Sequence, residues 1–214
     1  MKQKVSDYIA DRLAQEGISQ VFTVTGGGAM HLNDSLGHHP GLSCLYHHHE
    51  QAAAMAAEAY ARVDNRMAAV CVTSGPGATN AITGALCAWM DSIPMLVLSG
   101  QVRYDTTVRH SGLKIRTMGV QEYDITPSVE PMTKYAVMVT DPLTIRYHLE
   151  RAIYLAKTGR PGPCWLDLPL NVQSAVVETD DLKAYDPSED AKELPAPVSE
   201  ETVKQILEKL KLAS

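Results

Sequence analysis

Residues 68–77 read Ala-Ala-Val-Cys-Val-Thr-Ser-Gly-Pro-Gly, and this stretch decides the fold class. Its apolar start lacks the polar alternation of a half-exposed strand, which predicts a strand over residues 68–73 that is buried on both faces. The turn that follows contains Ser74, which can cap a helix, and Pro76, which suits a first helical turn. A helix over residues 78–90 is expected next, so the stretch predicts a buried strand, a turn and a helix in succession.

The same unit recurs along the chain. Residues 21–24 predict a strand, residues 25–32 a glycine turn that opens a helix, and residues 42–46 a strand that runs into an alanine-rich helix. Further strands are expected at 95–99, 137–139 and 164–168, and further helices at 5–15 and 142–157. Buried strands that alternate with helices favour parallel pairing. The sequence therefore predicts an α/β fold: a three-layer, doubly wound parallel sheet with helices on both faces.

Composition divides the chain into three parts. One domain is expected over residues 1–177, because a chain of 214 residues with 45% hydrophobic content can bury one good core. Residues 178–198 form an acidic, proline-punctuated run and are expected to be a linker. Residues 199–214 predict a capped amphipathic helix, which we interpret as the start of a truncated central domain. The apolar face of this helix carries Val203, Ile206, Leu207 and Leu210.

Charge and composition exclude several classes of partner. The net charge is −6, no basic run is present and aromatic residues make up 6% of the chain, so nucleic acid is not an expected partner. No apolar run reaches the ~20 residues that span a bilayer. The amino terminus has no signal-peptide core, so no membrane partner is expected and the predicted location is the cytoplasm.

Cysteine and histidine usage gives no metal site. The four cysteines are widely separated, form no CxxC pair and sit in apolar surroundings, which predicts buried reduced thiols. His47, His48 and His49 are consecutive, and three consecutive side chains cannot all face one ion. We therefore predict no metal-ligating residues in this chain.

Three predicted turns, near Gly26, Glu50 and Gly75, follow strands of the predicted parallel sheet. Open α/β sheets bind their ligands at the carboxyl ends of the strands, where helix amino termini favour anionic or polar groups. A dinucleotide is the first ligand to test, since Gly26 and Gly28 begin a GxGxxG pattern. The third glycine position of that pattern is His31, which counts against a nucleotide site.

Each turn also has a purely structural interpretation. Glu50 stands where a first-turn glutamate favours the positive end of a helix. Residues 73–80 can equally be a well-made strand-to-helix turn and nothing more. In a ligand site, Asn80 would lie one helical turn further along, with its amide able to face the same edge. Spacing alone leaves both interpretations open.

Several stretches together carry a resemblance that spacing cannot. In order along residues 5 to about 173, the chain resembles the amino-terminal, pyrimidine-binding domain of thiamine-diphosphate-dependent enzymes, above all the acetolactate synthase large-subunit group. The matching stretches are Val21-Phe22 with Gly26-Gly27, His49-Glu50-Gln51 with Ala57-Glu58-Ala59-Tyr60-Ala61-Arg62, Thr73-Ser74-Gly75-Pro76-Gly77-Ala78-Thr79-Asn80, Asp91-Ser92-Ile93-Pro94, Gly100-Gln101-Val102, Gln121-Glu122, Thr133-Lys134, and Arg160-Pro161-Gly162-Pro163 with Asp167 and Pro169.

The resemblance implies specific roles for two residues. Glu50 matches the glutamate that hydrogen-bonds a ring nitrogen of the cofactor's aminopyrimidine and stabilises its imino tautomer. Gln121 matches a glutamine that lines the substrate side of the pocket, where an uncharged amide can hold a 2-oxo acid; its alternative is an ordinary loop residue. Further cofactor contacts are implied at Thr25, Gly26, Gly27, Thr73, Pro76 and Asn80.

The resemblance also implies parts that lie outside this chain. Family enzymes hold Mg²⁺ and the diphosphate on a carboxyl-terminal domain with a Gly-Asp-Gly motif, and this sequence contains no such motif. The active site forms between this domain and the diphosphate-binding domain of a second subunit, so a homodimer or tetramer is expected and the isolated chain is expected to be inactive. FAD is possible in a central domain.

The implied reaction is decarboxylation of a 2-oxo acid such as pyruvate, followed by carboligation to a second 2-oxo acid. Thr25 departs from the proline that synthases commonly have before the double glycine, and Gly28 replaces a small side chain. His110 is followed by Ser111, where the decarboxylase branch tends to carry a histidine pair. The absence of this histidine pair favours carboligation over simple decarboxylation. The alternatives are a 2-oxo acid decarboxylase, a half-enzyme subunit, and a non-catalytic binding module on the same fold.

Overall fold

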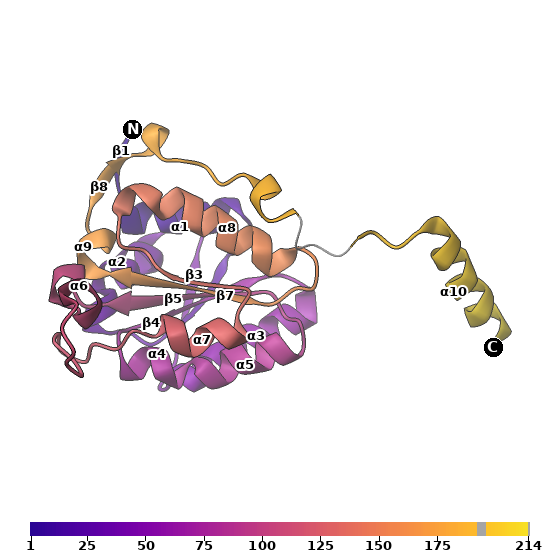
Figure 1. The fold of residues 1–214 in the computed structure, drawn as a ribbon, viewed down its shortest axis with the longest axis horizontal. Helices are drawn as coiled ribbons and strands as arrows, with labels where there is room; N and C mark the ends of the chain where they lie inside the picture. The colour runs from indigo at the N-terminus through magenta and orange to yellow at the C-terminus, as the bar shows by residue number, and fades with distance from the viewer. Residues whose placement is uncertain (192–195, 214) are drawn as a thin grey trace.

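The computed structural model describes residues 1–191 and 196–213 and has three layers (Figure 1). Its centre is a six-stranded sheet in the order β3-β2-β4-β5-β7-β6, and every neighbouring pair is parallel. The strands are β2 (Gln20–Thr23), β3 (Ser43–Tyr46), β4 (Ala68–Val72), β5 (Met95–Gln101), β6 (Tyr135–Met138) and β7 (Pro163–Pro169). The predicted doubly covered parallel α/β sheet is therefore confirmed.

Successive side chains of each central strand enter opposite cores, because strand side chains alternate between the two faces of a sheet. In β4, Ala69 and Cys71 pack in one core, whereas Val70 and Val72 pack in the other. Every position of β4, β5 and β7 is buried. Burial on both faces explains why these strands read as continuous apolar runs.

Helices cover each face of the sheet. The first core is covered by α1 (Val5–Gln15), α2 (Met30–His38), α8 (Ile145–Lys157) and the short α9 (Leu170–Gln173). The second core is covered by α3 (Glu50–Asp64), α4 (Pro76–Asn80), α5 (Ile82–Met90) and α7 (Thr126–Val129). Figure 1 shows α1 and α8 on one side of the strands and α3, α5 and α7 on the other.

Shorter helical elements connect these layers. They are η1 (Gly27–Ala29), η2 (Tyr104–Thr106), α6 (Val108–Ser111), η3 (Glu130–Met132) and η4 (Pro142–Thr144). Among the described residues, no helix is both long enough and apolar enough to span a membrane.

Strand β3 differs from the expected doubly buried strand. Leu45 is 47% exposed and Tyr46 is 63% exposed, so the prediction of burial on both faces is wrong here. The physical reason is position: β3 is an edge strand whose one neighbour among the described strands is β2, and the apolar run at 42–46 does not reveal that its outer side is uncovered.

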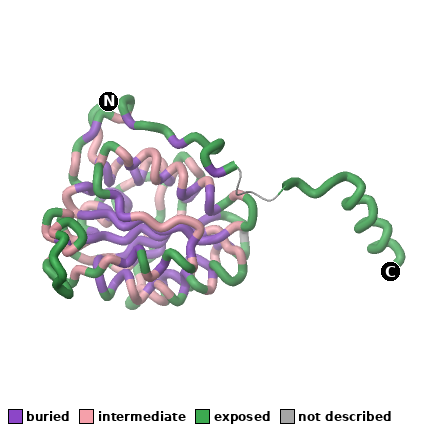
Figure 2. Tube along the Cα trace, viewed as in Figure 1, coloured by how far each residue is buried: buried purple, intermediate pink, exposed green. Residues whose placement is uncertain are grey.

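The segment that follows residue 178 packs on the domain along its first half, whereas a linker was expected. Strand β8 (Val176–Glu178) pairs antiparallel with β1 (Lys2–Lys4), and the chain then continues through η5 (Thr179–Asp181) and η6 (Pro187–Glu189). Leu182 and Tyr185 are buried. Their burial could not be predicted, because both residues stand alone inside an acidic run. Figure 2 shows buried positions within this outer segment.

An ion pair attaches the end of this segment to α8. The guanidinium of Arg151 donates to both carboxylate oxygens of Asp190, at 2.9 and 2.7 Å. The hydroxyl of Tyr185 donates to the same carboxylate at 2.7 Å. Arg151 holds the pKa of Asp190 below its ordinary value. Residues 192–195 of the predicted linker lie outside the described residues.

The last helix is α10 (Glu200–Leu212), and each of its residues is exposed. Ser199 caps it by accepting a hydrogen bond from the backbone N–H of Thr202, as the capping pattern predicted. The interpretation of residues 199–214 as the start of a central domain stays a prediction, and Ser214 lies outside the described residues.

The cysteine side chains are free thiols. Burial raises the pKa of Cys71 and of Cys164 to about 12, so both are unreactive protonated thiols at neutral pH. Cys44 and Cys87 are only half-buried. The prediction of buried thiols therefore holds fully for Cys71 and Cys164.

Candidate functional site

The candidate site lies at the carboxyl edge of the sheet, where three neighbouring parallel strands end. Strands β2, β3 and β4 end at Thr23, Tyr46 and Val72, in register with one another. Parallel pairing brings the segments that follow them to the same edge. The turns near Gly26, Glu50 and Gly75 are thus brought together, as the sequence predicted.

Glu50 is the first residue of α3 and is half-buried. His49 is the cap of this helix: its Nδ1 accepts a hydrogen bond from the backbone N–H of Gln51 at 3.1 Å. The ring of His47 packs against Phe22, with ring centroids 5.8 Å apart, while His48 is exposed. The histidine triplet therefore builds the entry to α3, and the positive end of the helix favours the Glu50 carboxylate.

Asn80 fixes the Glu50 carboxylate from the neighbouring helix. Its Nδ2 donates to Oε2 of Glu50 at 2.9 Å. The other oxygen, Oε1, lies 3.3 Å from the position that a Cβ on Gly77 would occupy, so the carboxylate rests against the first turn of α4. No described residue donates a hydrogen bond to Oε1. One oxygen of the carboxylate is thus positioned by Asn80, and the other accepts no hydrogen bond from the described residues.

Thr73 fills the space between the two glycine turns. A Cβ on Gly26 would lie 2.4 Å from Cβ of Thr73, and a Cβ on Gly77 would lie 2.6 Å from its Cγ2. The Oγ1 of Thr73 accepts a hydrogen bond from the backbone N–H of Gly28 at 3.0 Å. Gly28 is also needed here, because a Cβ on it would lie 2.8 Å from Oγ of Ser74. The glycines allow the two turns to pack against one threonine.

Gly75 brings in a third segment. Its φ of +54° and ψ of −115° lie where only glycine is unstrained. A Cβ on Gly75 would lie 2.0 Å from the backbone oxygen of Gln121. Gln121 itself has a φ of +58° and is exposed. The structure thus places the backbone of Gln121 directly against the turn between β4 and α4.

The remaining predicted cofactor contacts lie at the surface of the same edge. Thr25, Gly27 and Pro76 are exposed. Their chain neighbours Gly26 and Gly77 pack against Thr73. Within the residues that the structure describes, no group of three or more His, Cys, Asp or Glu side chains is arranged to hold a metal ion.

Two residues that support the first glycine turn were not predicted. Asn33 donates from Nδ2 to the backbone oxygen of Gly26 at 3.3 Å, and Gln173 donates from Nε2 to the backbone oxygen of Gly28 at 2.7 Å. Gln173 is fully buried, belongs to α9 and lies 145 residues after Gly28 in the sequence. No local sequence pattern predicts such a contact, because it depends on tertiary packing.

A buried acid lies deeper in the same edge. Asp167 on β7 is fully buried, and desolvation raises its pKa to about 7. Hydrogen bonds from Ser99 Oγ at 2.6 Å and Gln101 Nε2 at 3.1 Å favour the charged form and oppose that shift. Asp167 had matched the family without an assigned role, and the structure gives it two partners on β5.

Other residues that carried the resemblance have structural partners. Arg62 forms ion pairs with Glu58 on the same helix and with Asp91 at the end of α5. The pair between Arg62 and Asp91 joins α3 to the end of the neighbouring helix α5. Glu58, which is 7% exposed, holds the Arg62 guanidinium from the same helix. These positions hold the helices that carry the site and do not themselves reach its edge.

Comparison with known families now identifies the chain. A sequence profile described as "Thiamine pyrophosphate enzyme, N-terminal TPP binding domain" matches residues 3–122, which is more than half of the chain and includes Glu50, Asn80 and Gln121. The chain belongs to the thiamine pyrophosphate enzymes. The fold of a pyrimidine-binding domain and the dependence on thiamine diphosphate, both implied by the resemblance, agree with this assignment.

Individual relatives are acetolactate synthases. The chain is 37% identical over 172 residues to the acetolactate synthase large subunit of Lactococcus lactis, covering 80% of this chain and 28% of the relative. It is 38% identical over 167 residues to the isozyme 3 large subunit of Escherichia coli, covering 78% and 28%. It is 34% identical over 209 residues to the chloroplastic acetolactate synthase 1 of Oryza sativa, covering 96% and 31%. The chain thus spans about three tenths of the length of these relatives.

Proposed function

We propose that this chain supplies the pyrimidine-binding side of an acetolactate synthase-like active site. The reaction is decarboxylation of a 2-oxo acid such as pyruvate and carboligation of the product to a second 2-oxo acid. The observation that carries the proposal is the Glu50 carboxylate, which is presented by the amino terminus of α3 at the carboxyl edge of the sheet and is fixed by Asn80 through one oxygen.

The residues around Glu50 fit the aminopyrimidine end of thiamine diphosphate. Oε1 of Glu50 is the atom that would share a proton with a ring nitrogen, while Asn80 keeps the carboxylate oriented through Oε2. Bound there, the cofactor supplies the carbon nucleophile, and the protein supplies orientation. The proposed cofactor contacts, besides Glu50, are Thr25, Gly26, Gly27, Thr73, Pro76 and Asn80.

Gln121 is proposed as the catalytic-site residue on the substrate side. Its uncharged amide would hold the carboxylate or carbonyl of the 2-oxo acid by hydrogen bonding. Support comes from the contact of its backbone with Gly75, which places the residue beside the turn that leads into α4 and Asn80.

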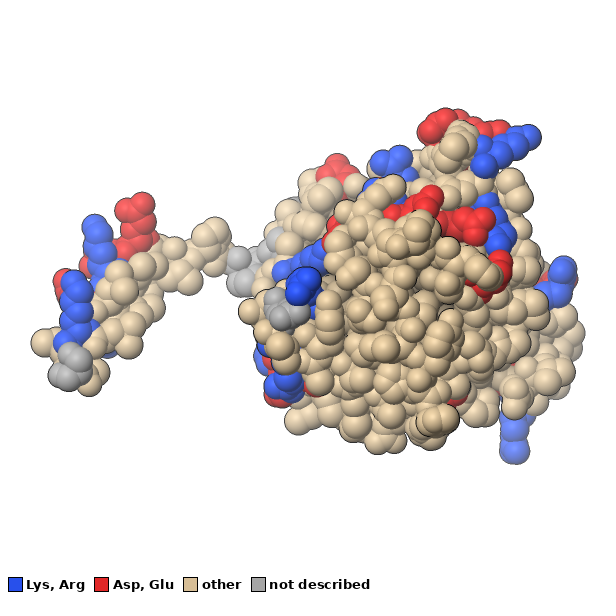
Figure 3. Space-filling view, turned by 180° about the vertical axis from the view of Figure 1, so that it is seen from behind, with Lys and Arg blue, Asp and Glu red and all other residues tan. Residues whose placement is uncertain are grey.

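Mg²⁺ and the diphosphate are proposed to bind on a separate domain of a second subunit, in a homodimer or tetramer. Helices α3 and α5, which pack together, expose large apolar side chains that water does not favour: Met55, Leu86, Trp89 and Met90. Figure 3 shows a broad area on the back of the domain without acidic or basic side chains. Exposed apolar side chains that gather on two neighbouring helices are typical of a protein–protein interface.

Two further proposals concern the setting of this domain. FAD, where the complete enzyme carries it, would bind in a central domain that continues from α10. The proposed location is the cytoplasm, where the free buried thiols Cys71 and Cys164 stay reduced.

The test is product analysis of the full-length protein supplied with pyruvate, thiamine diphosphate and Mg²⁺. A carboligase consumes two molecules of pyruvate and releases acetolactate and carbon dioxide, whereas a decarboxylase releases acetaldehyde. Acetolactate as the main product is the expected result. Acetaldehyde alone would replace the proposal with the decarboxylase alternative, and no consumption of any 2-oxo acid would favour a non-catalytic module.

A further inference from the structure

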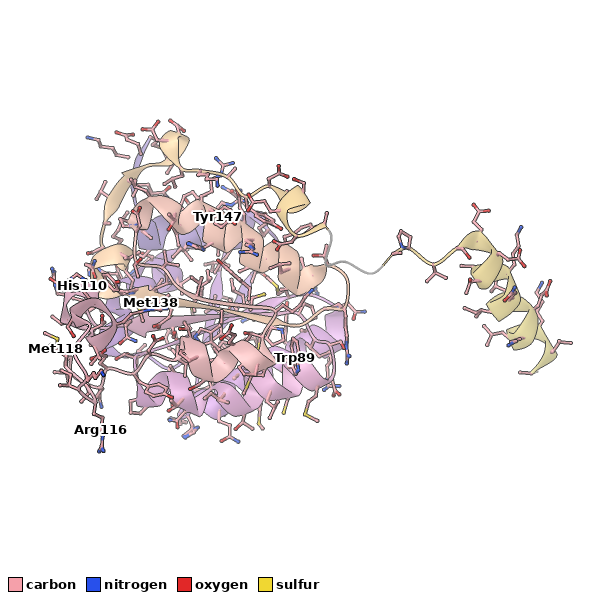
Figure 4. All side chains as sticks on the ribbon, in the orientation of Figure 1. Trp89, His110, Arg116, Met118, Met138 and Tyr147 are labelled. Carbon is pink, nitrogen blue, oxygen red and sulfur yellow. The ribbon has the colours of Figure 1, made fainter. Side chains whose placement is uncertain are left out.

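Residues 102–124 form a long loop that leaves β5 at the carboxyl edge and returns to the same edge. Figure 4 shows His110, Arg116 and Met118 of this loop at the end of the sheet toward which β5 points. Its outgoing end is fixed by α9, because the backbone N–H of Tyr104 donates to Oδ1 of Asn171 at 2.7 Å. Its returning end carries Gln121.

The carboxylate of Glu122 closes this loop on itself. Oε1 accepts a hydrogen bond from the backbone N–H of Val108 at 2.6 Å. Oε2 accepts from the backbone N–H groups of Met118 at 2.8 Å and Gly119 at 3.1 Å. Three backbone donors from both ends of the loop therefore meet at one carboxylate, and hydrogen bonds to a charged acceptor are stronger than neutral ones.

Gln101 ties the returning end of the loop to the core. Its side chain is 1% exposed, and its Nε2 donates both to the backbone oxygen of Tyr123 at 2.8 Å and to Oδ2 of Asp167 at 3.1 Å. Its Oε1 accepts from the backbone N–H of Val102 at 3.0 Å. Both N–H groups of the amide are thus used, one toward the loop and one toward the core.

The core side of this connection continues further. Ser99 donates to Oδ1 of Asp167 at 2.6 Å and accepts from Nε1 of Trp165 at 2.8 Å. All three side chains are fully buried. Gln101 therefore connects the loop to a fixed polar chain between β5 and β7, since buried and satisfied polar networks hold one geometry.

We propose that Glu122 and Gln101 are positioning residues for Gln121, holding its loop against the Gly75 turn. The role of Gln121 toward the 2-oxo acid rests on the proposed function. Gln121 immediately precedes Glu122 and lies two residues before Tyr123, whose backbone Gln101 holds. Both sets of bonds act at the returning end of the loop, where the backbone of Gln121 contacts Gly75.

Hydrogen–deuterium exchange of the purified protein tests the positioning role without any cofactor. Glu122→Gln keeps the size but replaces one accepting oxygen with a donor, and Gln101→Leu removes the bridge with nearly the same volume. Exchange of the amides in residues 102–124 is expected to rise about tenfold or more, the ratio expected for loss of a charge-assisted or buried hydrogen bond. Exchange in β4 and β5 should stay unchanged.

Each variant has a matched control. Glu130→Gln makes the same change at an exposed glutamate in η3. Gln20→Leu also removes an amide bond to a backbone oxygen, that of Ser43, at the opposite end of the sheet. Neither control should alter exchange in the loop. Loop exchange that is the same in Glu122→Gln and Gln101→Leu as in the controls would overturn the proposal.

A second measurement shows whether the two residues act through Gln121. In the full-length enzyme, kcat/KM for pyruvate should fall in Glu122→Gln, and this fall should vanish when Gln121 is already alanine. Equal falls in both backgrounds would mean that Glu122 acts elsewhere, which overturns the positioning role. If the wild-type protein consumes no 2-oxo acid, the proposed function fails, and the exchange result alone decides whether the loop is held as stated.

Discussion

The turn after β4 and the loop after β5 leave the same edge of the sheet, yet they are held in place in different ways. The turn at residues 73–77 is fixed by size: Thr73 fills space that Gly26 and Gly77 leave open. The loop at residues 102–124 is held by polar bonds to side chains: Asn171 at its outgoing end, and Glu122 and Gln101 at its returning end. A short turn can be specified by close packing. The long loop leaves its large apolar side chains, such as Leu113 and Val120, exposed, so hydrogen bonds hold its returning end.

This difference predicts different responses to pH and to added methyl groups. The loop connects through Gln101 to the buried carboxyl group of Asp167, so its attachment includes a titratable group. The turn is held by the packing of Thr73, whose side chain does not titrate. The following changes separate the two regions, beginning with the largest expected effect.

Asp167→Asn should remove a pH-dependent part of the stability. The pKa of Asp167 is raised to about 7, above the unfolded value, so the folded state keeps a proton that the unfolded state loses. This contribution is full below pH ~4 and is lost as the pH rises through ~7, a change of about 4 kcal/mol. Urea unfolding from pH 4 to 8 should show the wild-type stability falling relative to Asp167→Asn.

The relative slope should be steepest between pH 5 and 7 and should flatten above the folded-state pKa of about 7. Parallel curves for the wild type and Asp167→Asn would show that the buried carboxyl group titrates normally. The comparison of slopes matters more than the absolute offset, because Asn also alters the hydrogen bond to Gln101.

Gly75→Ala should be the most damaging methyl addition at the site. The new Cβ would lie 2.0 Å from the backbone oxygen of Gln121, at a φ that alanine avoids. Strain and contact together should cost about 2–4 kcal/mol in the free energy of unfolding. Gly112→Ala is the control, because Gly112 also has a positive φ of 65° but has open space around it. Equal losses at both positions would show that contact with the loop is unimportant.

Gly26→Ala should destabilise the protein by about 1–3 kcal/mol, since its Cβ would overlap Thr73. The neighbouring Gly27→Ala is the control, because apart from its chain neighbours no atom of the described residues lies within 4 Å of the position of its Cβ. Thermal unfolding should therefore separate two adjacent glycines. A Gly27 variant as unstable as the Gly26 variant would contradict the view that the turn is fixed by close packing.

Arg109→Ala should have the smallest effect. Arg109 pairs with Asp124 at 3.5 Å within the loop, and its side chain is 45% exposed. Exposed ion pairs contribute about 0–1 kcal/mol. Exchange of the loop amides should change little beside the effect of Glu122→Gln. A loss of loop protection as large as that of Glu122→Gln would show that surface charge, and not the Glu122 carboxylate, holds the loop.

Much of the fold could be predicted from sequence because its strands are buried on both faces. Continuous apolar runs, such as residues 68–73, mark such strands directly, and the glycine turns after them mark the edge that carries Glu50. The exposed outer side of β3 could not be predicted, because position in the sheet is a tertiary property. The packing of Tyr185 and Asp190 on α8 was hidden by an acidic composition that is typical of linkers.

The site was predicted in part for the same reason. Glu50 begins α3 and Asn80 ends the short helix α4 after the glycine turn; local patterns mark both turns, and the structure joins the two side chains by a hydrogen bond. Two other roles depend on contacts between segments that are distant in the sequence. Gln173 donates to the backbone of Gly28, and Gln101 joins Asp167 to the loop. A sequence pattern carries no signal for such contacts.

The most direct test of the central claim is turnover of pyruvate by Glu50→Gln in the full-length enzyme with thiamine diphosphate and Mg²⁺. His48→Asn, at an exposed neighbour in the same stretch, is the control. Loss of a positioned proton-transfer group should lower kcat by about 100-fold or more in Glu50→Gln, with His48→Asn near wild type. Turnover by Glu50→Gln equal to that of the wild type would contradict the account, because Glu50 would then have no part in the reaction.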